Sequence, residues 1–421
     1  MTDETPPPKH IDQKIWQIIL IAVIAIAFTV IWLETYLFVQ DVLWMNDFVL
    51  ANRWTIPVGV ILFSLLVGLS EKYLHAPDVI AGGFAESMQG EGVQSDYRTF
   101  PGTLLNSFFS MFSGASVGPE GCIAFLIKEI SAFVREKLAI SKDSALGFDV
   151  AALSSAYNGI IGSPLFTAVF ATELNIGKKD ALTFLAWNLI AGVIGFFFFT
   201  LLGVHSFASF FQFPPVEEVT LAYLLYAVVL GILGAGIAIF MGLAMKRIGT
   251  AVEKAFGGKI ITRVVCAGVI IGIVCYFIPD LMFSGETTIH GIMQNAAEIG
   301  ILMLLFMAVM KVLLLALSFK SGYLGGPIFP TIFICTMIGL ALNLVFPGVP
   351  VGILVLCTIA AVVTLALGAP LTAILLVIVI CPSNQNMAAL FAVSSVVALI
   401  IGIVMRQMRE ERAERVVKAS Q

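Results

Sequence analysis

Long apolar runs, broken at intervals by glycine and proline, make up most of this 421-residue chain. Several runs hold the roughly 20 apolar residues that a helix needs to cross a bilayer, whereas others are cut shorter. The expected full-length spans are 14–33, 54–70, 182–204, 222–244, 260–279 and 301–318. Shorter helical pieces are expected at 100–117, 120–134, 163–174, 327–346, 351–367 and 370–380. The pattern predicts an all-α polytopic membrane protein with about 12–18 helical pieces.

Composition supports the lipid bilayer as the surrounding solvent. Hydrophobic residues make up 59% of the chain and charged residues only 12%, against about 25% charged in an ordinary soluble domain. No Asp, Glu, Lys or Arg occurs from Ala181 to Val216 or from Ser321 to Met405. The six cysteines and four histidines show no metal-ligand spacing, so we expect no metal site. We also expect no cofactor and no nucleic-acid partner.

Charges between the apolar runs predict the orientation and the division of the chain. Basic residues gather near both ends and at 135–142 and 246–263, whereas the stretch at 280–298 is acidic. The positive-inside rule therefore places both termini in the cytoplasm, for a multi-pass protein of the cell membrane. We expect cytoplasmic tails at 1–13 and 406–421, and two halves of a transmembrane repeat at 14–216 and 217–405.

One carboxylate interrupts an apolar region in the segment FSGASVGPEGCIAFL, residues 112–126. A carboxylate at membrane depth costs a few kcal/mol, so Glu120 is expected to face a cavity or a polar partner. Its sequence context places it in the first turn of a helix, where free N–H groups and the positive end of the helix dipole attract anions. A plain helix cap is the simpler alternative.

Two further glycine-rich breaks precede helical pieces, in SGYLGGPIFPTIF at 321–333 and in VIAGGFAESMQG at 79–90. Interrupted apolar segments at corresponding places in two halves are typical of inverted-repeat transporters, whose site lies near the bilayer midplane. The alternative is that these glycines only let helices pack closely. That alternative leaves the carboxylate in one of the breaks unexplained.

These motifs resemble the CLC family of chloride channels and proton-coupled anion exchangers. That family shows G-S-G-I-P, G-[KR]-E-G-P and G-x-F-x-P in order, and here GPEGC at 118–122 is similar to the second and GPIFP at 326–330 to the third. SSAYNGIIGSPLFTAVFATEL and GAPLTAILLVIVI also resemble family segments, so the likeness extends over residues 54–405. It implies a CLC-like inverted repeat of broken and tilted helices, of a divergent bacterial ion-transport branch, assembled as a homodimer with one pore per subunit.

The resemblance also implies the site residues. Glu120 corresponds to a gating and proton-transferring glutamate, and Glu173 is a secondary candidate for which a structural role is favoured. The expected anion-binding positions are Gly82, Gly83, Phe84, Gly118, Gly121, Gly326, Ile328 and Phe329. Most of these positions would act through main-chain N–H groups, which can replace the hydration of an anion without trapping it.

Several positions depart from the family pattern. The first motif lacks its serine, the third carries Pro327 where an N–H is usual, the late tyrosine has no counterpart, and Leu174 stands where exchangers carry an internal glutamate. We also expect no regulatory cystathionine-synthase-type pair, which many eukaryotic members carry.

The favoured function is transport of a small, chloride-like inorganic anion, gated by Glu120 and coupled to protons. A passive channel and a fluoride exporter of the same fold remain open, and a non-transporting receptor or structural protein is a more distant alternative. The chain lacks the residues that an intramembrane protease or a cation transporter would need at membrane depth. No enzymatic activity is expected.

The sequence also predicts where three other polar residues lie. Lys311 ends a long apolar run. A place near the aqueous route is one alternative for it, but its long side chain is expected to reach the membrane interface. Glu286 and His290, in FSGETTIHG, are expected in an external loop.

Overall fold

The computed structural model describes residues 14–77, 96–174, 181–216, 218–381 and 385–420, and this part of the chain is almost entirely helical. The helices of the first half are α1 (Ile15–Trp44), α2 (Asp47–Ala51), α3 (Thr55–Tyr73), η2 (Tyr97–Thr99), α5 (Phe100–Phe112), α6 (Pro119–Lys137), α7 (Lys142–Ile161), α8 (Phe166–Glu173), α9 (Ala181–Leu201) and η4 (Phe207–Phe210). Those of the second half are α10 (Leu221–Phe256), α11 (Ile260–Phe277), η5 (Pro279–Leu281), α12 (Ile289–Gln294), α13 (Ala296–Ile299), α14 (Ile301–Ser321), α15 (Ile328–Val345), α16 (Val351–Leu367), α17 (Pro370–Ile380) and α18 (Gln385–Ser420). Eight of these described helices are long and apolar enough to cross a membrane. The predicted all-α polytopic class is confirmed.

The boundaries of the predicted pieces agree with the helices to different degrees. α16 and α17 match the expected ranges, whereas α1 and α10 continue well beyond them, to Trp44 and Phe256. The expected spans omit α7 and α18. Charged and serine-rich positions lower the hydropathy of α7, and α18 passes from an apolar run into the charged segment after Met405 without a break.

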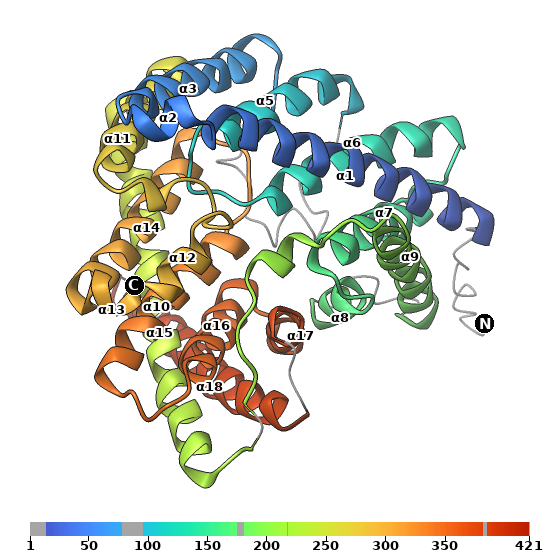
Figure 1. Cartoon of the computed structure of the whole chain (residues 1–421). Coiled ribbons are helices and arrows are strands. Elements are labelled where there is room, and N and C mark those ends of the chain that lie inside the picture. Colours follow the sequence, from blue (N-terminus) through green and yellow to red (C-terminus); the bar gives the residue numbers. More distant parts are fainter. Residues whose placement is uncertain (1–13, 78–95, 175–180, 217, 382–384, 421) are drawn as a thin grey trace, which may run out of the picture.

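The two halves repeat one packing pattern. α1 packs against α7 and α9, and α10 packs in the same way against α16 and α18. α6 packs on α7, and α15 packs on α16. Figure 1 shows the blue and green helices of the first half along the top and right, and the orange and red helices α15 to α18 from the lower left to the lower centre. Contacts between α3 and α11 and between α8 and α17 join the halves, as the inverted-repeat prediction requires.

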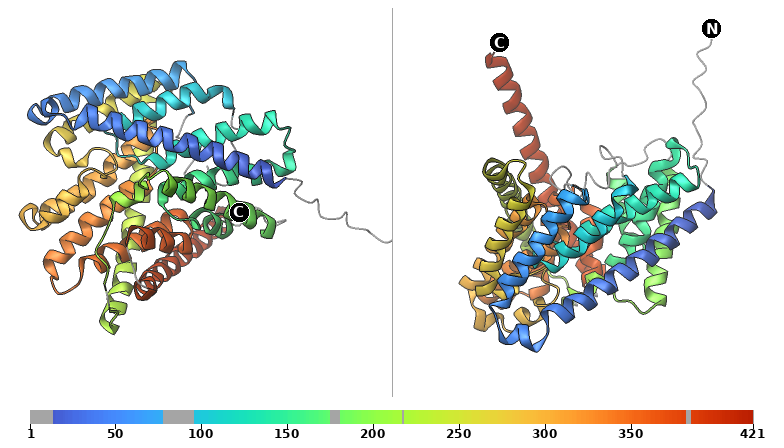
Figure 2. Two further views of the ribbon diagram at one scale, coloured as in Figure 1. Left: turned by 45° about the vertical axis from the view of Figure 1, so that its right-hand side comes forward. Right: turned by 90° about the horizontal axis from the view of Figure 1, so that it is seen from above.

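Several helices are too long to stand upright in a bilayer. α1 has 30 residues, which corresponds to about 45 Å of helix against a hydrocarbon thickness of about 30 Å. Figure 2 shows α1 running obliquely across the body in the right-hand view, while the end of α18 projects beyond it. A helix of this length therefore tilts relative to the bilayer normal.

The local sequence explains where α6 and α15 begin, inside the protein. Gly118 caps α6, Pro119 and Glu120 occupy its first turn, and Arg135 and Lys137 lie in its last turn. This arrangement matches the sign of the helix dipole at both ends. α15 begins directly after Pro327, and its first residues are fully or almost fully buried.

Candidate functional site

The glycine-rich breaks before α6 and α15 meet in the interior of the protein. Gly118 N–H donates to the carbonyl oxygen of Gly326 at 2.7 Å, and Gly326 N–H donates to that of Gly118 at 2.7 Å. The pair forms an isolated antiparallel bridge. Two helix starts that lie about 200 residues apart in the chain are thereby held side by side, which is the convergence that the motifs predict.

Glycine is required at this crossing because the backbones come too close for side chains. A Cβ atom on Gly121 would lie 2.0 Å from the carbonyl carbon of Gly325. A Cβ atom on Gly326 would lie 2.2 Å from the carboxyl carbon of Glu120. Both distances are far below van der Waals contact, so any larger residue would displace one helix start or the Glu120 side chain.

The Glu120 carboxylate lies between the two helix starts and is fully buried. Its Oε1 accepts a hydrogen bond from the main-chain N–H of Ile328 at 2.7 Å. Its Oε2 has no hydrogen-bond partner among the described residues. The hydroxyl of Tyr157 donates to the main-chain carbonyl of Glu120 at 2.6 Å. The carboxylate of α6 therefore occupies the positive end of α15, where a free anion would also be attracted.

The first turn of α15 offers main-chain donors in apolar surroundings. Pro330 has no N–H, so Ile328 and Phe329 are the donors of this turn. The Phe329 ring stacks on Phe211 with centroids 5.4 Å apart and meets Phe207 edge-on at 4.6 Å. The structure thus brings together Glu120, Ile328 and Phe329 with the predicted glycines 118, 121 and 326. The predicted positions Gly82, Gly83 and Phe84 lie outside the described residues.

Glu173 belongs to another place in the fold. Its carboxylate accepts hydrogen bonds from the main-chain N–H groups of Leu371 at 2.6 Å and Thr372 at 2.8 Å, and from the Thr372 hydroxyl at 2.7 Å. The residue at the end of α8 therefore caps the start of α17. This geometry supports the structural role favoured for Glu173.

The expectation that Lys311 reaches the membrane interface is wrong. The residue lies in the middle of α14 and is fully buried. Its ammonium group donates to the carbonyl oxygens of Leu281 at 3.0 Å and Phe283 at 2.6 Å, and lies 4.7 Å from the centre of the Phe333 ring. Carbonyl oxygens and an aromatic face replace the water that the cation would otherwise seek.

Glu286, expected in an external loop, is also buried. Its carboxylate accepts hydrogen bonds from the Tyr36 hydroxyl at 2.7 Å, the Gln40 amide at 3.1 Å and the Ser284 hydroxyl at 2.6 Å. These bonds fasten the segment before α12 to α1. No local pattern in the sequence could have identified this contact, because Tyr36 and Glu286 are 250 residues apart.

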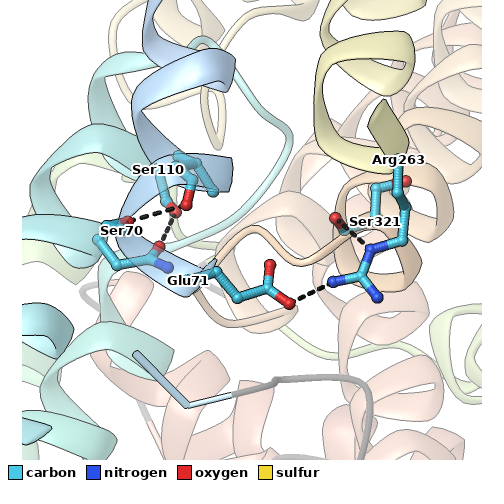
Figure 3. Close-up of polar contacts among 7 residues, drawn as sticks. Ser70, Glu71, Ser110, Arg263 and Ser321 are labelled. Atoms are coloured by element: carbon cyan, nitrogen blue, oxygen red, sulfur yellow. Dashed lines mark hydrogen bonds and ion pairs between the residues drawn. The ribbon is translucent and has the colours of Figure 1, made fainter. Parts of the chain in front are cut away.

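A buried ion pair lies next to Gly322, at the start of the glycine-rich segment that leads into α15. Figure 3 shows the guanidinium group of Arg263 directed at the Glu71 carboxylate and at the main-chain oxygen of Ser321. The contact joins α3, α11 and the end of α14. Neither Glu71 nor Arg263 was predicted as a partner, and their only signal in the sequence is that opposite charges occur at the ends of two apolar runs.

Broken helices that point two N-termini at one buried position define a class of membrane transport protein. The family model described as "Voltage gated chloride channel" matches residues 77–402 of the chain. The chain therefore belongs to the CLC family of voltage-gated chloride channels.

Relatives and solved structures agree with this placement. "Putative ion-transport protein YfeO" of Salmonella newport is 26% identical over 270 residues, which cover 62% of this chain and 63% of that protein. The protein of the same name from Salmonella typhimurium matches equally. The chain thus spans about 63% of the length of these curated relatives. A slow cyanobacterial Cl⁻/H⁺ antiporter superposes with a TM-score of 0.76 at 18% identity, over 93% of both chains. A CLC-type fluoride/proton antiporter superposes with a TM-score of 0.74 at 18% identity, over 92% of this chain and 94% of the other.

Proposed function

We propose that this protein moves a small inorganic anion across the membrane through a pore in each subunit, and that protonation of Glu120 gates this movement and couples it to protons. The observation that carries the proposal is the hydrogen bond from Ile328 N–H to the buried Glu120 carboxylate. A carboxylate held by a helix start occupies a place that suits another anion. When the carboxylate takes up a proton it loses its charge, and with it most of its attraction to the helix dipole.

The deciding experiment is flux in liposomes that contain the purified protein, with anion movement and pH recorded together. Chloride and fluoride are offered separately, because the two structural neighbours are named for these ions. Coupled proton movement would support the exchanger, and anion flux without it would support a passive channel, which the apolar Leu174 favours. Absence of flux with any anion would reject the proposal. No enzymatic activity is part of the proposed function.

A homodimer is expected in the membrane. α9, α17 and α18 carry exposed apolar side chains that include Val193, Phe197, Leu371 and Ile400. Such faces pack closely against a second copy, and closed two-fold pairs are the commonest oligomers. Crosslinking in native membranes and mass measurement in mild detergent should both give the dimer. A monomer in both measurements would count against it.

Both termini are proposed to face the cytoplasm. The last turn of α6 carries Arg135 and Lys137, and α18 ends in a segment with Arg406, Arg409 and Arg412. The right-hand view of Figure 2 places the ends of these two helices on the same side of the body. Protease added outside sealed cells should therefore leave the C-terminal arginine segment intact. Cleavage there from the outside would overturn the orientation.

A further inference from the structure

We infer that Glu129 is a second proton-exchanging carboxylate, which takes up protons at the side of the membrane where α6 ends and passes them along buried polar groups of α5 toward Glu120. This inference rests on the proposed function. Glu129 is nine residues after Glu120 on the same helix, which places it about 13 Å away along the axis. That separation is too long for direct transfer, so intermediate polar groups are required.

The surroundings of Glu129 suit a group that changes its protonation state. The residue is only 5% exposed. Its Oε1 accepts hydrogen bonds from the hydroxyls of Thr99 and Thr103, both at 2.8 Å. Its Oε2 has no hydrogen-bond partner among the described residues. Hydroxyl groups can donate to the carboxylate and accept from the carboxylic acid, so either form can be accommodated.

Three other carboxylates are held differently. Arg263 pairs with Glu71, and two main-chain N–H groups with the Thr372 hydroxyl hold Glu173. Glu286 accepts hydrogen bonds from three side chains. Among the described residues, Glu129 accepts hydrogen bonds only from two threonine hydroxyls, with no cation and no main-chain N–H group.

A cavity gives Glu129 a route to water. A hollow of about 440 Å³ opens between η2 and the end of α6, and Tyr97, Arg98, Ala132 and Glu136 contribute to its lining. Ala132 and Glu136 follow Glu129 by three and seven residues, which places all three on one face of α6. A proton from water in this cavity needs to pass only one turn of helix to reach Glu129.

Several charged groups around this position have partners other than Glu129. On η2 and just before it, Asp96 accepts from the main-chain N–H of Arg98, and Tyr97 donates to Glu136 of α6 at 3.2 Å. Arg135 of α6 pairs with Asp149 of α7 at 2.7 Å. On α6 itself, Lys128 precedes Glu129 and Lys137 lies in the last turn. The neighbouring helices carry Glu34 and Asp41 on α1 and Lys142 and Asp143 at the start of α7, whereas α5 carries no charged residue. None of the hydrogen bonds and ion pairs among the described residues joins a cation to Glu129.

Buried polar groups on α5 continue from Glu129 toward the helix starts. Thr103, Asn106, Ser107 and Ser110 recur at helical spacing and are fully buried. The Ser110 hydroxyl donates to the Asn106 side-chain oxygen at 2.9 Å and accepts from Leu324 N–H at 2.9 Å. Figure 3 shows Ser110 in the same view as the ion pair of Glu71.

The polar stripe ends close to the site. Leu324 belongs to the segment that leads into α15, and its carbonyl accepts from the thiol of Cys122 at 3.2 Å. Cys122 lies two residues after Glu120 on α6. The stripe therefore joins the neighbourhood of Glu129 to that of Glu120.

The proton carriers are the hydroxyl groups of Thr103, Ser107 and Ser110 with water molecules between them. Each carrier accepts a proton on its oxygen and gives up its own O–H proton to the next, so one O–H bond forms as another breaks. Asn106, Leu324 and Cys122 line this route and exchange no proton.

The test is Glu129→Gln in liposomes that contain the full-length protein. The expected result is anion flux close to that of the parent with proton movement reduced at least several-fold, and partial recovery of proton movement in Glu129→Asp. Glu253→Gln is the matched control, because this exposed glutamate of α10 is not part of the cavity lining. It should leave both fluxes unchanged. An unchanged proton-to-anion ratio in Glu129→Gln would overturn the inference while leaving the proposed function intact.

Carbodiimide labelling gives a second measurement that does not need coupled transport. Glu129 should be labelled from the side where α6 ends. Ala132→Phe puts a larger side chain into the cavity and should slow that labelling. A Glu129 carboxyl that resists labelling in the folded parent would overturn the inference. A parent that moves anions without protons would instead reject the proposed coupling, and the relay with it, whatever the labelling shows.

Discussion

Glu120→Gln should preserve anion flux and remove most of its pH dependence together with any coupled proton movement. Glutamine keeps the size of the side chain and an oxygen that can accept from Ile328 N–H, but it carries no charge and binds no proton. It therefore resembles the protonated glutamate at every pH. In the parent, flux should rise as the pH falls, because protonation removes the charge that competes with the anion for the start of α15.

A purely structural Glu120 would give another result. If the carboxylate only caps α6, its replacement should cost about 1 kcal/mol of stability and leave transport unchanged. Flux has to be compared on folded protein at matched density in the liposomes, with Glu253→Gln on α10 as a second acid-to-amide change. Unchanged pH dependence and coupling in Glu120→Gln, with anion flux demonstrated in the parent, would reject the gating role.

Gly326→Val should abolish anion flux. A Cβ atom at this position already falls 2.2 Å from the Glu120 carboxyl carbon, and valine adds two methyl groups to it. The side chain would occupy the space through which an anion approaches Ile328 N–H, and it would also strain the bridge to Gly118. Replacement of Ile328 or Phe329 by another apolar residue should alter flux only modestly, because the main chain supplies the donors.

Gly236→Val provides the matched control for this change. Gly236 lies in α10, and a Cβ atom there would meet no other atom within 4 Å. The control should fold and transport as the parent does, apart from the small helix-propensity effect of valine. Normal transport by a correctly folded Gly326→Val protein would place the anion pathway elsewhere.

Local features of the chain predicted much of the fold and the central part of the candidate site. The apolar runs at 351–367 and 370–380 coincide with α16 and α17, because a proline near the start and an uncharged interior determine a short membrane helix without reference to its neighbours. The position of Glu120 in a first helical turn followed from Gly118 and Pro119 in the same way. Deep burial of the carboxylate followed from its apolar surroundings.

The sequence alone therefore determined a bilayer-embedded helical protein with two glycine-broken helix starts and one carboxylate among them. Only the tertiary structure decided which groups satisfy the buried charges. In the folded chain, Lys311 donates to main-chain carbonyls at and just after the end of η5, Glu286 accepts hydrogen bonds from α1, and Arg263 pairs with Glu71. Helix starts depend on neighbouring residues in the chain, so a local pattern reveals them. A buried charge depends on whichever groups packing brings to it, and Glu71 and Arg263 are 192 residues apart.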